Sequence, residues 1–187
     1  YAIRVDQVVS NLTISNFRIE AAHSDGGGAS GIIIYGASEP RGIEICNNVI
    51  KGNDRGVSPQ DTSPLVVNNT FYGNTLGIGI ADINSKGIYK NNIFASNTNA
   101  ISAVSQGSGS KVLSEVSWNL FFDNTVDFSG VAACSPNCIF DSDPLLVNPA
   151  GQDHHISPGS PAIDMGAMVI NAANNINAPK DDFDFQN

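Results

Sequence analysis

Short segments of similar sequence recur through the chain, at residues 12–19, 43–50, 65–71, 88–94 and 116–122. The four clearest copies align on one asparagine and lie 21, 23 and 27 residues apart. These column asparagines are Asn48, Asn69, Asn92 and Asn119, and a second column five residues later holds Asn53, Asn74, Asn97 and Asn124. A supersecondary unit repeated at this spacing is typical of a solenoid.

Within each copy, apolar and polar residues alternate over three to five positions, which predicts short β-strands. A column of large apolar residues supplies the core: Ile50, Phe71, Phe94 and Phe121. Each copy is too short to bury its own apolar face, so neighbouring copies must stack. The sequence therefore predicts an all-β, right-handed parallel β-helix with coils of about 21–27 residues. We expect the asparagines of successive coils to form hydrogen-bonded ladders.

The repeat fades after Phe128, which divides one domain into two parts. We assign residues 1–130 to the coils and residues 131–187 to a closing segment of the same domain. Tyr1 is not a methionine and stands just before a predicted strand, so we expect the chain to be a piece of a longer protein.

Charged residues make up 14% of the chain, and its formal net charge is −9. This balance argues against nucleic acid as a partner, because proteins bind nucleic acid through clustered Lys and Arg. It also disfavours binding of polyanions, unless bound cations invert the local field. No apolar stretch is long enough to predict a membrane span.

Cys134 and Cys138 flank a short loop and predict a disulfide, with free thiols or a metal site as the alternatives. Cys46 lies alone in a predicted strand, where a packing role is expected. A disulfide favours an extracellular or cell-surface location.

The segment 143–166 reads DPLLVNPAGQDHHISPGSPAIDMG. It resembles the closing segment of secreted right-handed β-helix proteins of the pectate-lyase-like superfamily. The Asn-Asn repeats resemble those of the NosD-type and polysaccharide-lyase members. The resemblance implies export and an association with acidic polysaccharides, and it gives His155 and Asp164 packing roles. The chain carries no match to the catalytic or calcium motifs of the lyases.

A lyase or epimerase acting on uronic acids must neutralise a carboxylate and move a proton. Asp61 and Asp82 occupy equivalent positions in successive coils, so we expect their carboxylates to stack and to bind calcium or substrate. Lys86 and Arg41 could face the same surface as the catalytic cations. The alternative is a pair of solvated turn aspartates.

His23 opens a glycine-rich insertion, which predicts either a substrate-binding loop or a flexible turn. Lys51, Asp54 and Arg55 form a second charged group, for which we expect a local ion pair at the surface.

Two functions fit these residues. The first is an extracellular β-helix that binds or processes an acidic polysaccharide, as a lyase or uronate epimerase if it is an enzyme. The second is a non-catalytic scaffold, adhesin or filament subunit that self-associates through exposed coil ends, since unpaired strand edges invite pairing.

Overall fold

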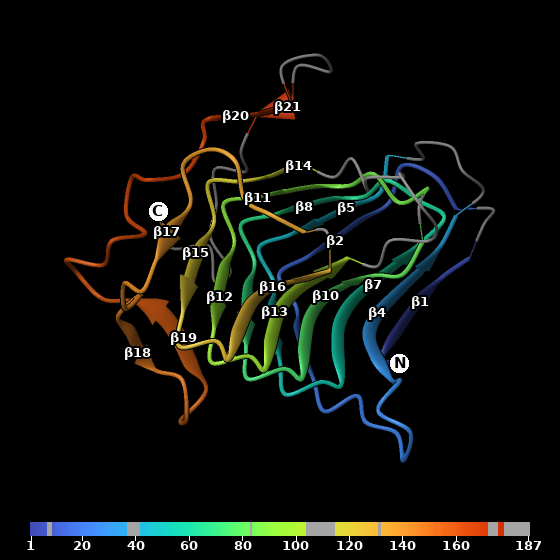
Figure 1. Cartoon of the computed structure of the whole chain (residues 1–187), viewed down its shortest axis with the longest axis horizontal. Coiled ribbons are helices and arrows are strands. Elements are labelled where there is room, and N and C mark those ends of the chain that lie inside the picture. The colour runs from blue at the N-terminus through green and yellow to red at the C-terminus, as the bar shows by residue number, and fades with distance from the viewer. Residues whose placement is uncertain are drawn as a thin grey trace.

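Three parallel β-sheets wind around one apolar core in the computed structural model (Figure 1). The structure describes residues 1–6, 9–36, 42–82, 84–103, 115–130, 132–171 and 176–177. This part of the chain contains strands and no helix, so it offers no helix able to cross a membrane. The predicted all-β solenoid is confirmed.

Each coil crosses sheet B, then sheet C, then sheet A. Sheet A contains six strands: β1 (Ile3–Val5), β4 (Ser30–Tyr35), β7 (Arg55–Gln60), β10 (Leu76–Ile80), β13 (Asn99–Ala103) and β16 (Val126–Gly130). Sheet B contains five: β2 (Thr13–Ser15), β5 (Glu44–Cys46), β8 (Leu65–Val67), β11 (Ile88–Lys90) and β14 (Glu115–Ser117). Sheet C contains six: β3 (Arg18–Glu20), β6 (Val49–Lys51), β9 (Thr70–Tyr72), β12 (Ile93–Ala95), β15 (Leu120–Phe122) and β17 (Ile139–Phe140).

The strand register matches the columns of the repeat. In sheet C, Phe71 pairs with Phe94 and Phe94 with Phe121, and all three side chains are fully buried. Their rings stack nearly parallel, with centroids 4.7 Å and 5.1 Å apart. The apolar column thus becomes a continuous stack along the solenoid axis, which stabilises each coil through its neighbours.

Both predicted asparagine ladders are present. In the first, the Nδ2 groups of Asn48, Asn69 and Asn92 each donate to the Oδ1 of the next asparagine at 3.0–3.1 Å. The second ladder connects Asn53, Asn74, Asn97 and Asn124 in the same way. The same Oδ1 atoms also accept the backbone N–H of the preceding coil's asparagine, as Asn69 Oδ1 does from Asn48. The ladders therefore supply hydrogen-bond partners to buried backbone N–H and C=O groups where the chain turns.

The residue before each first-ladder asparagine adopts a left-handed backbone. Asn47, Asn68 and Asn91 have φ values of 55°, 54° and 55°, and Trp118 takes the same conformation in the fourth copy. Asparagine tolerates this region better than most residues, which explains the Asn-Asn pairs.

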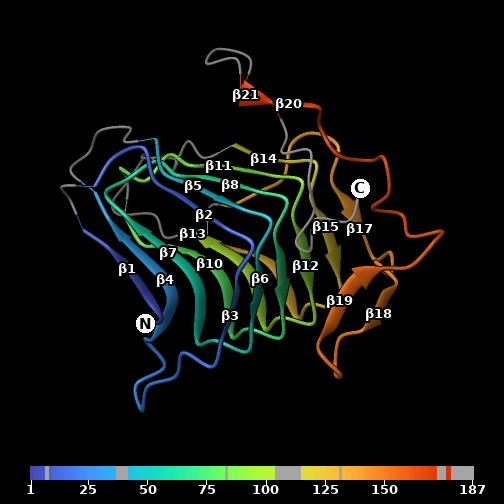
Figure 2. The ribbon, with the colours of Figure 1, turned by 180° about the vertical axis from the view of Figure 1, so that it is seen from behind.

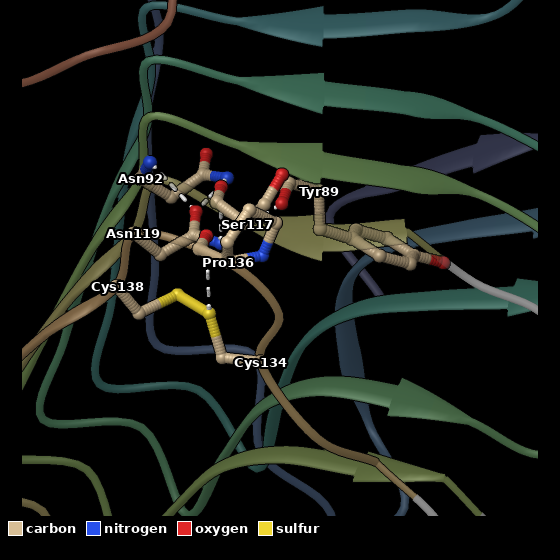
Figure 3. Close-up of a disulfide and its surroundings, with 7 residues drawn as sticks. All are labelled: Tyr89, Asn92, Ser117, Asn119, Cys134, Pro136 and Cys138. Atoms are coloured by element: carbon tan, nitrogen blue, oxygen red, sulfur yellow. Dashed lines mark hydrogen bonds between the residues drawn. A yellow bond between two sulfur atoms is a disulfide. The ribbon is translucent and has the colours of Figure 1, made fainter.

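The disulfide loop covers the end of sheet B. The predicted bond between Cys134 and Cys138 is confirmed, and both residues pack against the core. The Ser135 N–H donates to the Val116 carbonyl at 2.9 Å, where a further strand of sheet B would otherwise pair. Figure 3 shows the disulfide beside Asn119, the last asparagine of the first ladder.

Residues 143–168, called the strap below, fold back along the outside of the solenoid. The strap begins with the antiparallel hairpin of β18 (Leu146–Asn148) and β19 (Asp153–Ile156). Figure 2 shows this hairpin beside the outer face of sheet C. Further along, Ala167 exchanges two hydrogen bonds with the Asn91 side chain, at 2.7 Å and 2.9 Å. A second antiparallel pair follows, β20 (Val169–Asn171) and β21 (Ile176–Asn177).

Candidate functional site

Asp61, Asp82 and Lys86 lie together at the corner between sheets A and B. Asp82 accepts the Asp61 N–H and the Ser85 hydroxyl at Oδ2, both at 2.8 Å. Its Oδ1 accepts the N–H groups of Asn84 and Ser85 at 2.9 Å. These four hydrogen bonds give the Asp82 carboxylate a structural role, because they close the turn and connect two coils. Lys86 is exposed, and its N–H donates to Ser63 Oγ at 3.3 Å.

The calcium role of Asp61 and Asp82 stays a prediction. Among the described residues, no three or more His, Cys, Asp or Glu side chains gather as a metal site would require. Arg41, the other predicted catalytic cation, lies outside the described residues.

His23 lies at the opposite end of the sheet A strands, at the corner between sheets C and A. Its Nδ1 is 2.8 Å from Asp54 Oδ1, although the two residues are 31 positions apart in sequence. The His23 side chain is 61% exposed, whereas that of Asp54 is only 11% exposed. The Asp54 carboxylate thus holds one ring nitrogen and leaves the other to solvent, an arrangement that suits proton transfer.

Asp54 also organises the glycine-rich loop. Its Oδ2 accepts the N–H groups of Ser24 at 2.8 Å and of Ala29 at 3.3 Å. The hydrogen bond from His23 and those from the loop backbone hold the pKa of Asp54 below its usual range.

The prediction of a local ion pair among Lys51, Asp54 and Arg55 is wrong. Asp54 binds His23, and Lys51 lies 3.9 Å from Glu20. The reason is the register: Glu20 is the direct neighbour of Lys51 in the coil before it. Arg55 has no carboxylate partner within the described part of the chain.

The outer face of sheet A carries a row of small residues along the solenoid axis. A Cβ on Gly56 would contact Ile50 and Phe71 in the core, and Val57 is fully buried, so both neighbours point inward. Strict alternation does not hold at this point of the strand: Arg55 is partly exposed, whereas Ser58 is only 1% exposed and its Oγ accepts a hydrogen bond from the Ser30 hydroxyl at 3.0 Å. The register places Gly79, Ser102 and Ser129 in line with Ser58.

Longer polar side chains flank this row in the first coils. Tyr35 pairs with Gln60 in the register, and the Arg4 guanidinium lies 4.9 Å above the Tyr35 ring. Asp6 binds Arg4 at 2.8 Å and fixes it in place. The outer face of sheet A thus combines the Arg55 guanidinium, the Gln60 amide, the partly exposed hydroxyls of Ser102 and Ser129, and the Tyr35 ring. Of these residues only Arg55 was named from the sequence, in the second charged group; the inward valines and isoleucines of the repeat could have indicated that the others lie on the outer face.

The molecule is thus a parallel β-helix with a polar outer face on its longest strands and a histidine–aspartate pair at one end of them. The family model described as "Periplasmic copper-binding protein (NosD)" matches residues 2–142. The chain belongs to the NosD family, as the Asn-Asn repeats suggested. No curated protein and no solved structure gives a significant match.

The described residues do not fit the copper of the family description. No group of three or more His, Cys, Asp or Glu side chains gathers among them. Burial raises the pKa of the Cys46 thiol to about 12, and the side chain packs in an apolar cluster with Leu65 and Val67. The other two cysteines are joined in the disulfide. No step proposed below involves copper.

Proposed function

We propose that this chain acts outside the cytoplasm, as a β-helix that binds an acidic polysaccharide along the outer face of sheet A. The periplasmic location in the family's description supports the compartment. The disulfide between Cys134 and Cys138 also supports it, because such bonds persist in oxidising compartments.

The observation that carries the proposal is Arg55 beside the row of small residues. A uronate polymer needs a cation for its carboxylates and polar groups for its hydroxyls. Arg55 can bind a carboxylate with two parallel hydrogen bonds, since no described carboxylate already pairs with it. Gln60, on the same strand, supplies an amide group, and the partly exposed Ser102 and Ser129 of later coils supply hydroxyl groups.

The rigidity of the sheet favours an extended ligand. Strands of one sheet lie about 4.8 Å apart, so equivalent side chains of successive coils form a regular line. Because the asparagine ladders and ring stacks already hold these strands, binding requires little ordering of the protein. The net charge of −9 opposes polyanions in general, which confines the proposed binding to the neighbourhood of Arg55.

Binding is tested by calorimetric titration with oligosaccharides of galacturonate and of alginate, and with a neutral glucan for comparison. Replacing Arg55 by Gln should weaken binding of the acidic ligands by about tenfold or more, because a charge-assisted hydrogen bond usually contributes that much to affinity. The matched control is Arg18→Gln, which removes the same charge from sheet C and should leave affinity unchanged.

Failure of every acidic ligand to bind, or equal losses in Arg55→Gln and Arg18→Gln, would overturn the proposal. The non-catalytic scaffold would then be the better assignment. Ultraviolet absorbance of unsaturated uronate products, followed on the same ligands, separates turnover from binding alone. If products form, His23→Gln should abolish them while affinity is retained, because His23 carries the exposed ring nitrogen beside sheet A.

A further inference from the structure

His154 is a buried histidine whose ring has no hydrogen-bond partner among the described residues. It lies on β19 of the strap, is only 8% exposed, and both of its ring nitrogens are unsatisfied there. Its ring packs edge-on against Tyr72 of sheet C, with centroids 5.4 Å apart. The resemblance predicted a packing role for His155, but that side chain is 44% exposed and pairs with Asp153. The alternation of β19 turns adjacent histidines to opposite faces, so His154 is the buried one.

The charges around His154 oppose its protonation. Burial is the largest cause that lowers its pKa, and Lys51 and Arg18 of sheet C lower it further. On its own hairpin, the Gln152 backbone and Asp153 act in the opposite direction, but Asp153 is engaged by His155. Two further carboxylates lie in this region: Glu20 faces Lys51, and Asp143, which lines the adjoining cavity, accepts the Leu145 N–H at 2.8 Å. A proton on His154 would therefore add a positive charge to a desolvated site already flanked by two cations.

The seam between the strap and sheet C is loosely packed beside this histidine. A half-open cavity of about 220 Å³ separates the hairpin from the sheet, lined by Tyr72, Phe122, Leu146 and Pro149 among others. The hydrogen bond from Arg18 to the Gln152 carbonyl is long, at 3.5 Å. The two bonds between Asn91 and Ala167 hold the strap at its other end. The contact of His154 with Tyr72 therefore contributes to the attachment of the hairpin to sheet C.

We propose that the strap is a pH-sensitive latch, in which protonation of His154 releases the β18–β19 hairpin from sheet C. In the released state the imidazole is hydrated and regains an ordinary histidine pKa of about 6.5. The docked state binds fewer protons, since burial and the two cations depress the pKa there. The equilibrium constant for docking is therefore highest above about pH 6.5. It falls by up to tenfold for each pH unit below that value.

Release would uncover apolar surface. Ala95 and Leu120 of sheet C are only 2% and 3% exposed. They are strand neighbours of the inward-facing Phe94 and Phe121, so their own side chains lie on the outer side of the sheet. The other end of the strap stays attached to sheet B, where Ala167 packs over Cys46 and Val67 and bonds Asn91. The latch offers an exported protein a way to expose this surface only in acidic surroundings.

The latch is tested on the full chain by amide hydrogen exchange of the hairpin, corrected for the intrinsic pH dependence of exchange. Between about pH 7.5 and about pH 5, protection of residues 153–156 should fall by about tenfold or more. His154→Phe keeps an aromatic ring against Tyr72 but cannot be protonated, so its hairpin should stay protected at both pH values. The neighbouring control, His155→Gln, should open as the parent does, because His155 is exposed.

A second readout keeps the proposal testable if a variant packs poorly. The imidazole pKa of His154 in the parent, measured by NMR titration, should lie below about 6.5. Unchanged protection of the parent on acidification would overturn the latch. The latch would equally be overturned if His154→Phe opened with acid as the parent does, or if the measured pKa were not depressed. None of these outcomes depends on polysaccharide binding.

Discussion

Replacing Asn69 by alanine tests the ladder in the middle of the solenoid. Asn69 is 1% exposed and its side chain makes five hydrogen bonds. Nδ2 donates to the carbonyls of Ile45 and Val67 and to Asn92, while Oδ1 accepts the backbone and side-chain N–H groups of Asn48. The substitution removes all five.

The cost depends on which partners have another bond. The Val67 carbonyl still accepts the Asn47 N–H, and Asn92 Oδ1 still accepts the backbone N–H of residue 69. The Asn48 N–H, by contrast, loses its acceptor in a site that is 1% exposed. A stranded buried amide costs about 1–3 kcal/mol and each net hydrogen bond about 1 kcal/mol, so we expect a loss of about 3 kcal/mol.

The free energy of unfolding is measured by urea denaturation, followed by circular dichroism and by the fluorescence of Trp118. The control is Asn84→Ala, because Asn84 is exposed and its backbone N–H alone bonds Asp82; a change within about 0.5 kcal/mol is expected. A loss below about 1 kcal/mol for Asn69→Ala would refute the reasoning, since it would mean that water satisfies the stranded groups.

Two further substitutions test local packing and charge. Gly77→Ala should cost about 1–3 kcal/mol in urea denaturation, because the new Cβ would approach the Ala100 carbonyl, whereas Gly28→Ala, with open space around it, should be nearly neutral. Asp54→Asn should expose the 24–29 loop to protease at neutral pH, and Asp25→Asn should not. In the parent, the stabilisation by Asp54 is complete above the ordinary aspartate pKa of about 3.9 and is lost as the pH falls through the lowered pKa. Protease resistance of the loop that is independent of pH would contradict this role.

The fold could be predicted because its contacts repeat. Asn69 contacts its equivalents one coil away, so a single period in the sequence specifies the strand register, the ladder and the ring stack together. The loop disulfide was also predictable, since Cys134 and Cys138 are close in sequence. In each case the partners are related by the repeat or by a short loop.

The candidate sites were only partly predictable. His23 and Asp61 could be selected as chemically capable, yet no column of the repeat indicated that His23 pairs with Asp54. An insertion such as the 24–29 loop has no equivalent in other coils, so its contacts follow from packing alone.

The solenoid is specified by local sequence, because its coil length, its core column and its ladders follow from interactions between adjacent copies of one unit. The position of the strap, by contrast, follows from long-range packing, which buries His154 against Tyr72 while His155 faces solvent. The strap contacts residues such as Asn91, which lies 76 positions before Ala167, and Tyr72, and no repeat relates these partners.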